Sequence, residues 1–180
     1  MRLVRFFVLI AVLLIGGATG ATVLITVEEA LELAFPGAAI KRETLFLDEN
    51  QRAEVHELSG VQTTSALATR FVATNDGGWV IGYAYLDTHL VRTLPETVMV
   101  ALEADGAVRT VEVVTFREPL EYMPREGWYG QYVGRELDDD LALKRGIRPV
   151  TGATLTARAT TEAVRRVLAV HKVAGGGETQ

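Results

Sequence analysis

The segment whose residue types most readily support chemistry is Thr151–Thr156, a run of threonines and small residues. It directly precedes a stretch whose pattern predicts a helix. The first backbone N–H groups of a helix have no partner within it and, together with the helix dipole, favour a phosphate. Gly152 and Ala153 let a ligand approach the backbone, and the threonine hydroxyls can form hydrogen bonds or be esterified. The same residues also suit an ordinary helix N-cap preceded by a tight turn, so spacing alone leaves both interpretations open.

No other cluster in the sequence has the spacing of a familiar catalytic or metal site. The histidines, His56, His89 and His171, stand far apart and lack the short intervals typical of zinc ligands. The acidic triplet Asp138–Asp140 is more typical of a solvated helix start than of a calcium site, and we interpret His89 and Arg92 as polar surface. We find no nucleophile–base–acid set and no close carboxylate pair that indicates hydrolysis.

The composition excludes several further classes of chemistry. The 180 residues contain no cysteine, which excludes disulfides, thiolate-held iron–sulfur clusters, thioether-linked haem and thiol catalysis within this chain. With 18 basic and 23 acidic residues and a net charge of −5, the chain lacks the positive excess typical of nucleic-acid binding. We therefore expect any redox or catalytic chemistry to come mainly from a bound organic group.

The elements that must position this segment follow the mixed pattern of one α+β domain, residues 28–172, with a loose tail over 173–180. Capping residues, turn signals and apolar spacing predict the elements. The predicted helices cover Glu28–Phe35, a stretch capped by Asp48 and running to Leu58, and about Ala157–His171. The predicted strands include Trp79–Leu86, Thr97–Leu102 and Val108–Phe116. Asp105-Gly106 readily supplies the positive φ angles of a tight turn, so we expect the last two strands to form a hairpin.

The N-terminal residues 1–27 have the pattern of an export signal or a membrane anchor. Two arginines precede the run Phe6–Val27, which contains no charged residue and is long enough to cross a bilayer, at about 20 residues. Small residues over Gly16–Ala21 offer a cleavage site, whereas Val23–Ile25 extend the apolar stretch and favour a retained anchor. Either interpretation places the following domain on the outer, periplasmic side of the cytoplasmic membrane.

The segment and the residue before it, Val150–Thr156, resemble the Ser/Thr-Gly-Ala-Thr flavinylation motif of the FMN-binding domain family. This family includes components of the sodium-translocating NADH:quinone reductase and of the Rnf complex, and the periplasmic domain of the nitrous oxide reductase regulator. The resemblance extends over about Val80–His171 and includes the Gly82-Tyr83 strand, the Asp105-Gly106 hairpin and the segment Phe116–Pro119. It implies an antiparallel sheet flanked by helices and a membrane-bound or exported setting.

The resemblance also implies the cofactor and its contacts. FMN is expected to be attached through a phosphoester to Thr154, the last threonine of the motif, by a flavin transferase. Glu118 matches a glutamate that follows the hairpin in the family and is expected near the cofactor, although a capping or salt-bridged role suits it equally. Backbone and hydroxyl contacts to FMN are expected from the other motif residues: Thr151, Gly152, Ala153, Leu155 and Thr156.

The sequence departs from the family pattern at Arg148, where the motif for covalent attachment commonly has aspartate. A guanidinium there can weaken attachment and favour FMN held without a covalent bond, or it can pair with the phosphate as a charge-assisted donor. Tyr122, Trp128 and Tyr129 are candidates to cover the flavin ring, and each also suits an anchoring role in the core or a loop.

Two classes of function follow from these observations. The favoured one is an exported, membrane-associated flavoprotein that carries electrons between membrane and periplasmic redox partners, rather than an enzyme with its own substrate. The alternative is a flavin-free exported accessory or sensor module with the same fold. A flavin-dependent reductase is a weaker third interpretation, since the sequence offers no signature of a substrate pocket.

Overall fold

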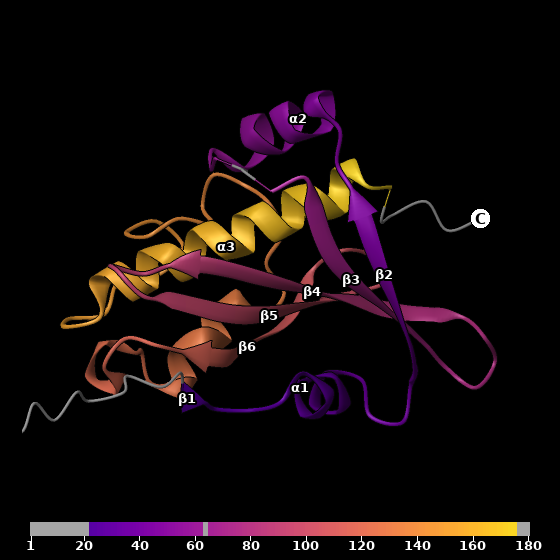
Figure 1. Ribbon diagram of the computed structural model, residues 1–180, viewed down its shortest axis with the longest axis horizontal. Coiled ribbons are helices and arrows are strands. Elements are labelled where there is room, and N and C mark those ends of the chain that lie inside the picture. The colour runs from indigo at the N-terminus through magenta and orange to yellow at the C-terminus, as the bar shows by residue number, and fades with distance from the viewer. Residues whose placement is uncertain (1–21, 63–64, 176–180) are drawn as a thin grey trace, which may run out of the picture.

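The structure, a computed structural model, describes residues 22–62 and 65–175. Its strands are β1 (Thr22–Val23), β2 (Ala39–Phe46), β3 (Leu67–Thr74), β4 (Val80–Leu90), β5 (Pro95–Glu103) and β6 (Val108–Phe116). Its helices are α1 (Val27–Ala34), α2 (Glu49–Ser59) and α3 (Thr154–Val173), with two 3-10 helices, η1 (Leu120–Tyr122) and η2 (Glu126–Tyr132). Every strand pairing is antiparallel, and the order across the sheet is β1-β6-β5-β4-β3-β2 (Figure 1).

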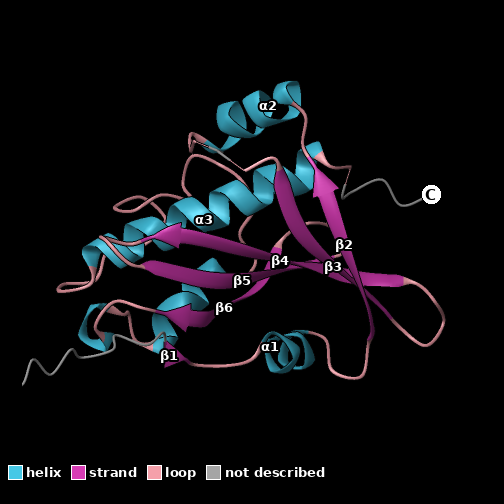
Figure 2. Cartoon of the chain, viewed as in Figure 1, coloured by secondary structure: helices cyan, strands magenta, loops and turns pink. Residues whose placement is uncertain are grey.

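Helices cover both faces of this sheet, as Figure 2 shows, with α1 on one side and α3 on the other. Strand β5 contributes to both cores because successive side chains of a strand point to opposite faces. Val98, Val100 and Leu102 face α3, whereas Met99 and Ala101 face α1, and all five are fully buried. The expected α+β fold with an antiparallel sheet flanked by helices is therefore confirmed.

Local capping signals predicted the two N-terminal helices well. The Glu29 N–H donates to the Thr26 hydroxyl at 3.1 Å, and the Thr26 N–H donates to the Glu29 carboxylate at 2.9 Å, which completes a capping box. The Gln51 N–H donates to Asp48 at 2.8 Å, and α2 ends at Gly60, whose φ of 69° is left-handed.

The predicted hairpin is confirmed as β5 and β6. The Gly106 N–H donates to the Glu103 carbonyl at 3.0 Å, and Gly106 has a φ of 92°. The two strands of this hairpin are neighbours within the sheet, and both contribute side chains to the core under α3.

Several elements differ from the sequence-based expectation, among them β1 and β3, for which no strand bounds were predicted. Strand β2 has no counterpart in the prediction, because its sequence contains Lys41, Arg42 and Glu43 and shows little alternation of apolar and polar residues. It forms one edge of the sheet, pairs with β3 and is largely exposed. Strand β4 continues past Leu86 to Leu90, where Asp87 binds Arg166 of α3 and His89 binds Glu96 of the neighbouring strand β5.

The last residues of the predicted export or anchor segment are part of the folded domain. Thr22 pairs with Phe116, the Leu24 N–H donates to the Val114 carbonyl at 3.1 Å, and Ile25 packs beneath α1. Residues 1–21, which hold the rest of that segment, lie outside the described residues. Among residues 22–62 and 65–175, no helix has both the length and the apolar content needed to cross a membrane.

Candidate functional site

The motif forms the entry and first turn of α3, which begins at Thr154 rather than near Ala157 as expected. Gly152 adopts a φ of 86°, and Ala153 occupies the N-cap position. An alanine side chain has no atom that can accept a hydrogen bond, so the first-turn N–H groups have no side-chain cap. These N–H groups are the donors that suit an anion.

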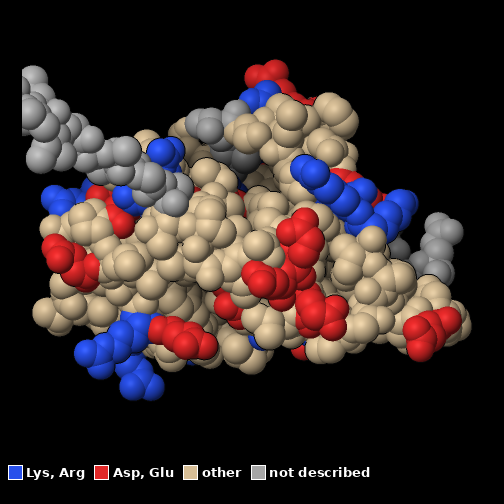
Figure 3. All heavy atoms as spheres, turned by 60° about the horizontal axis from the view of Figure 1, so that its bottom comes forward, with Lys and Arg blue, Asp and Glu red and all other residues tan. Residues whose placement is uncertain are grey.

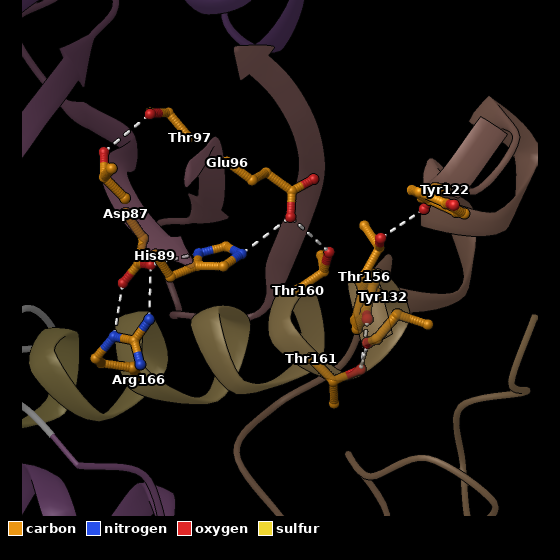
Figure 4. A network of polar contacts seen from close by, with 12 residues as sticks. Asp87, His89, Glu96, Thr97, Tyr122, Tyr132, Thr156, Thr160, Thr161 and Arg166 are labelled. Carbon is orange, nitrogen blue, oxygen red and sulfur yellow. Dashed lines mark hydrogen bonds and ion pairs between the residues drawn. The ribbon is translucent and has the colours of Figure 1, made fainter. Parts of the chain in front are cut away.

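The hydroxyl groups of the motif have different environments. Thr154 is exposed, and its hydroxyl donates to the Val150 carbonyl at 3.0 Å. Thr156 is buried, and its hydroxyl donates to the Tyr122 carbonyl, which ties η1 to the first turn of α3 (Figure 4). The Thr154 hydroxyl is therefore accessible for modification, whereas the Thr156 hydroxyl is engaged within the protein.

A hollow of about 160 Å³ lies at this helix end, lined by residues 152–156 together with Arg92 and Tyr122. The guanidinium of Arg92 stands over the Tyr122 ring, 5.1 Å from its centroid. Pockets that enclose small molecules usually measure about 300–1,000 Å³. This hollow therefore suits an anionic group, while the rest of a larger ligand would extend out of it.

Glu118 contacts the turn between β4 and β5. Its carboxylate accepts hydrogen bonds from the N–H groups of Thr93 and Leu94, both at 2.9 Å, and the residue is 8% exposed. These backbone hydrogen bonds, that from Thr93 first, hold the pKa of Glu118 below its usual value. Glu118 does not line the hollow, so the structure places it as a holder of the turn.

The three candidate aromatic residues do not share one role. Tyr122 lines the hollow, whereas Tyr129 is buried in the core under α3. The Trp128 indole N–H donates to the Arg148 carbonyl at 2.7 Å, and its ring packs edge-on against Tyr129. Trp128 thus anchors the connection that precedes the motif.

Neither Arg148 nor the acidic triplet forms part of the hollow. The backbone N–H of Arg148 donates to the Gln131 side chain at 2.9 Å, and the arginine side chain is exposed. Asp138 accepts a hydrogen bond from the Leu141 N–H at 2.8 Å within a turn. The expected helix start at Asp138–Asp140 is therefore wrong, because no helix begins at these residues. In the part of the chain that the structure describes, no group of three His, Cys, Asp or Glu side chains could hold a metal ion.

The sequence-based interpretation of His89 as polar surface is wrong. His89 has a side chain only 10% exposed and lies between two carboxylates, with Asp87 on Nδ1 and Glu96 on Nε2, both at 2.9 Å (Figure 4). Arg166 of α3 donates two hydrogen bonds of 2.7 Å to Asp87. Burial opposes the charged imidazole, but the hydrogen bonds to Asp87 and Glu96 outweigh it and raise the pKa of His89 to about 9.

This buried network fixes α3 on the sheet and thereby positions the candidate site. Asp87 and His89 belong to β4, Glu96 to β5 and Arg166 to α3, and the Thr160 hydroxyl of α3 also donates to Glu96, at 3.3 Å. Asp87, Thr88 and His89 are consecutive polar residues, and their role depends on the pairing of β4 with β5, which sets His89 opposite Glu96.

The opposite face of the molecule has a different electrostatic character. Figure 3 shows acidic side chains gathered on the face that α1 covers, and α1 itself exposes Glu28, Glu29 and Glu32. The exposed carboxylates of α1 disfavour an anion beside that helix, whereas the N-terminus of α3 favours one.

The donors at the hollow fit the phosphate end of a nucleotide cofactor. Uncapped backbone N–H groups, one exposed hydroxyl and one guanidinium are the groups that bind phosphate in proteins. No other side chain that lines the hollow is charged.

Comparison with known proteins identifies this part of the chain. Residues 94–169 match the model of the FMN-binding domain family, a shorter stretch than the expected 80–171. The match runs from the end of the β4–β5 turn into α3 and contains Glu118, Tyr122 and Thr151–Thr156. No curated protein matches the chain. The region that contains the candidate site therefore belongs to the FMN-binding domain family, which confirms the resemblance of its motif.

Proposed function

We propose that this protein is an electron carrier whose FMN is held by its phosphate at the first turn of α3 and is esterified to Thr154. The observation that carries the proposal is the exposed Thr154 hydroxyl at an uncapped helix N-terminus, within the segment that matches the FMN-binding family. When bound, FMN supplies a ring system that accepts one or two electrons. The protein's own residues then need to hold it, orient it and set its exposure.

Esterification changes few contacts of the protein. The Thr154 oxygen forms a bond to the FMN phosphorus, while the anhydride bond between this phosphorus and the second phosphate of a flavin dinucleotide donor breaks. The hydroxyl proton and the nucleoside monophosphate leave, so the chain gains the mass of FMN less water. The Val150 carbonyl loses the hydroxyl donor at 3.0 Å but keeps the Ala153 N–H at 3.3 Å. The N–H groups of the first turn, including those of Leu155 and Thr156, remain available for the phosphate oxygens.

The small size of the hollow favours a carrier over an enzyme with its own substrate. A hollow of about 160 Å³ holds the phosphate end and leaves the flavin ring largely outside the protein. Such exposure suits exchange of electrons with partner proteins, and a covalent bond compensates for the small contact area.

We also propose that the domain is exported and stays close to the membrane. The support is the sequence of residues 1–27, with two arginines followed by an uncharged apolar run. Fusion of an alkaline phosphatase reporter after residue 175 tests this proposal, since that enzyme is active only after export. Membrane fractions washed at high pH then distinguish a retained anchor from a cleaved signal peptide.

Loading with FMN is tested by co-expression of the chain with a flavin transferase. We expect a fluorescent band that survives denaturation and a mass gain of FMN less water. Thr154→Ala should abolish both signals, while Glu162→Ala, at an exposed position of α3 outside the hollow, should keep them.

The outcomes separate the three possibilities. A yellow protein that loses its colour on denaturation would show that FMN is bound as a cofactor but without a covalent bond. A protein that is colourless in its native state and unmodified after denaturation would overturn the proposal and favour the flavin-free accessory module.

A further inference from the structure

The turn between β4 and β5, residues 91–94, brings a positive charge to the hollow at the first turn of α3. Arg92 lines this hollow opposite the motif, with its guanidinium over the ring of Tyr122. Within residues 22–62 and 65–175, the Arg92 side chain makes no ion pair, whereas Arg70, Arg109 and Arg166 each pair with a carboxylate. The charge of Arg92 is therefore available to an anion.

Two contacts fix the position of this charge. The Tyr122 ring supports one face of the guanidinium, and the Tyr122 carbonyl accepts the Thr156 hydroxyl, so the ring is tied to the helix turn that supplies the N–H donors. On the other side, Glu118 accepts the N–H groups of Thr93 and Leu94 at 2.9 Å and so holds the backbone next to Arg92.

We propose that Arg92 is the side-chain cation that binds the phosphate of FMN, and that Glu118 is a positioning residue that acts through the turn carrying Arg92. The inference rests on the proposed function, because it assigns a further residue to the same site. A guanidinium presents paired donors that match phosphate oxygens, and a phosphate in ester linkage to Thr154 keeps a negative charge for it to bind. Arg92 lies just outside the family match, which begins at residue 94.

Arg148 is the competing candidate, since its position relative to the motif suggested contact with the phosphate. It does not line the hollow, and its neighbourhood is anchored by Trp128 and Gln131 instead. Arg148→Gln is therefore the matched control for Arg92→Gln, because both changes remove one exposed arginine near the motif.

The test measures binding of free flavins to the Thr154→Ala protein, which cannot form the ester. Dissociation constants for FMN and for riboflavin, which lacks the phosphate, are obtained from flavin fluorescence. We expect Arg92→Gln to weaken FMN binding about tenfold, as for loss of a charge-assisted hydrogen bond, and to leave riboflavin binding unchanged. Arg148→Gln should leave both constants within about twofold.

The positioning role of Glu118 has its own readout. Glu118→Ala should weaken FMN binding as Arg92→Gln does, and the double variant should lose no more than either single one. Glu118→Gln keeps an oxygen that accepts the Thr93 and Leu94 N–H groups, so it should restore most of the affinity. A purely structural role for Glu118 predicts equal losses for FMN and riboflavin and no such non-additivity.

The covalently loaded protein provides a second measurement. It tests the assignment of Arg92 even if free flavins bind the Thr154→Ala protein too weakly for a dissociation constant to be measured. Loading should raise the Tm of the Thr154-containing protein more at low salt than at high salt, because Arg92 gains a charged partner. Arg92→Gln should remove this salt-dependent part, and Arg148→Gln should retain it.

Failure of the inference and failure of the proposed function give different results. A wild-type protein that neither binds FMN nor becomes loaded overturns both. A protein that binds or carries FMN, but whose FMN affinity and salt-dependent Tm shift are the same with Gln at position 92, overturns only the assignment of Arg92.

Discussion

At the scale of single residues, a position without a side chain can be fixed by close packing. Gly82 of β4 faces α1, where a Cβ atom would collide with the Leu102 carbonyl oxygen and the ring of Phe35. The carbonyl belongs to the neighbouring strand β5 and cannot move without disturbing the pairing of the two strands. Glycine is therefore required here so that the Leu102 carbonyl and the Phe35 ring can approach the backbone of β4 closely.

Gly82→Ala should lower the free energy of unfolding by about 1–3 kcal/mol, the usual cost of overpacking a core. Gly127→Ala is the control, because a Cβ atom at Gly127 meets nothing within 4 Å, and we expect a change of about 0.5 kcal/mol or less. Urea denaturation followed by circular dichroism measures both. Equal stability of the two variants would contradict the close contact of Gly82 with Leu102 and Phe35.

His89 should titrate far from the ordinary range for histidine. Its hydrogen bonds to Asp87 and Glu96 outweigh the effect of burial and raise its pKa to about 9, whereas burial and the charge of Arg70 lower the pKa of His171 to about 4. An NMR titration of the imidazole signals, assigned with single His→Gln variants, should show these two midpoints. A midpoint below about pH 7 for His89, close to that of a free imidazole, would contradict the ion-pair network.

The raised pKa of His89 also has a predictable effect on stability. Because the folded state binds the proton more tightly than the unfolded state, the stabilisation is complete below the unfolded pKa of about 6.5. It decreases as the pH rises from there through the folded pKa of about 9. The free energy of unfolding of the wild-type protein should therefore fall across this interval.

At the scale of elements, α3 is held by its central part while its first turn forms the candidate site. Arg166 bonds to Asp87 of β4, and Thr160 bonds to Glu96 of β5, so one helix is joined to two adjacent strands. The network lies in the interior, where removal of one partner leaves an uncompensated charge.

Arg166→Met should therefore lower the free energy of unfolding by about 2–4 kcal/mol, because it leaves Asp87 with His89 as its remaining charged partner. Arg158→Met is the matched control on the same helix, since Arg158 is exposed and forms no ion pair within the described residues. Thermal unfolding of both variants near neutral pH provides the comparison. A loss for Arg158→Met as large as that for Arg166→Met would contradict a special role of the network.

The elements that were predictable from sequence are those whose signals are local. The capping partners of Thr26 and Asp48 lie three residues away, and the turn at Asp105-Gly106 is contained in the hairpin it closes. Strand β2 was missed because its only partner, β3, lies beyond α2 in the sequence, and edge strands tolerate charges on their surface.

The candidate site was predictable only in part, for the same physical reason. Thr151–Thr156 is a continuous motif and could be recognised as such. Tyr122 was a candidate to cover the flavin ring, but its contact with Arg92 in the hollow depends on the completed sheet, which brings the β4–β5 turn to η1. The role of His89 depends on Arg166, which is 77 positions away in the chain and belongs to another element.

At the scale of the whole molecule, the sheet separates two faces that are covered by different helices. The candidate flavin site lies at the N-terminus of α3 on one face, and the acidic α1 covers the other. Residues 22–26 join the edge of the sheet and cap α1, so the chain that leads to residues 1–21 is fixed to the domain from residue 22 onward. The folded unit thus begins before residue 28, the position at which the sequence-based domain starts because the uncharged apolar run ends at Val27.

This arrangement predicts different results for two truncated chains. A chain beginning at Thr22 keeps the pairing of β1 with β6, the packing of Ile25 and the capping box of Thr26. A chain beginning at Glu28 loses all three, and loss of a helix cap alone typically costs about 1 kcal/mol. We therefore expect the shorter chain to unfold at a lower temperature, while co-expression with a flavin transferase loads both chains at Thr154, which lies on the far face. Equal Tm values would show that residues 22–27 contribute nothing to the fold, and loss of loading in the shorter chain alone would show that the edge strand is needed to shape the site at α3.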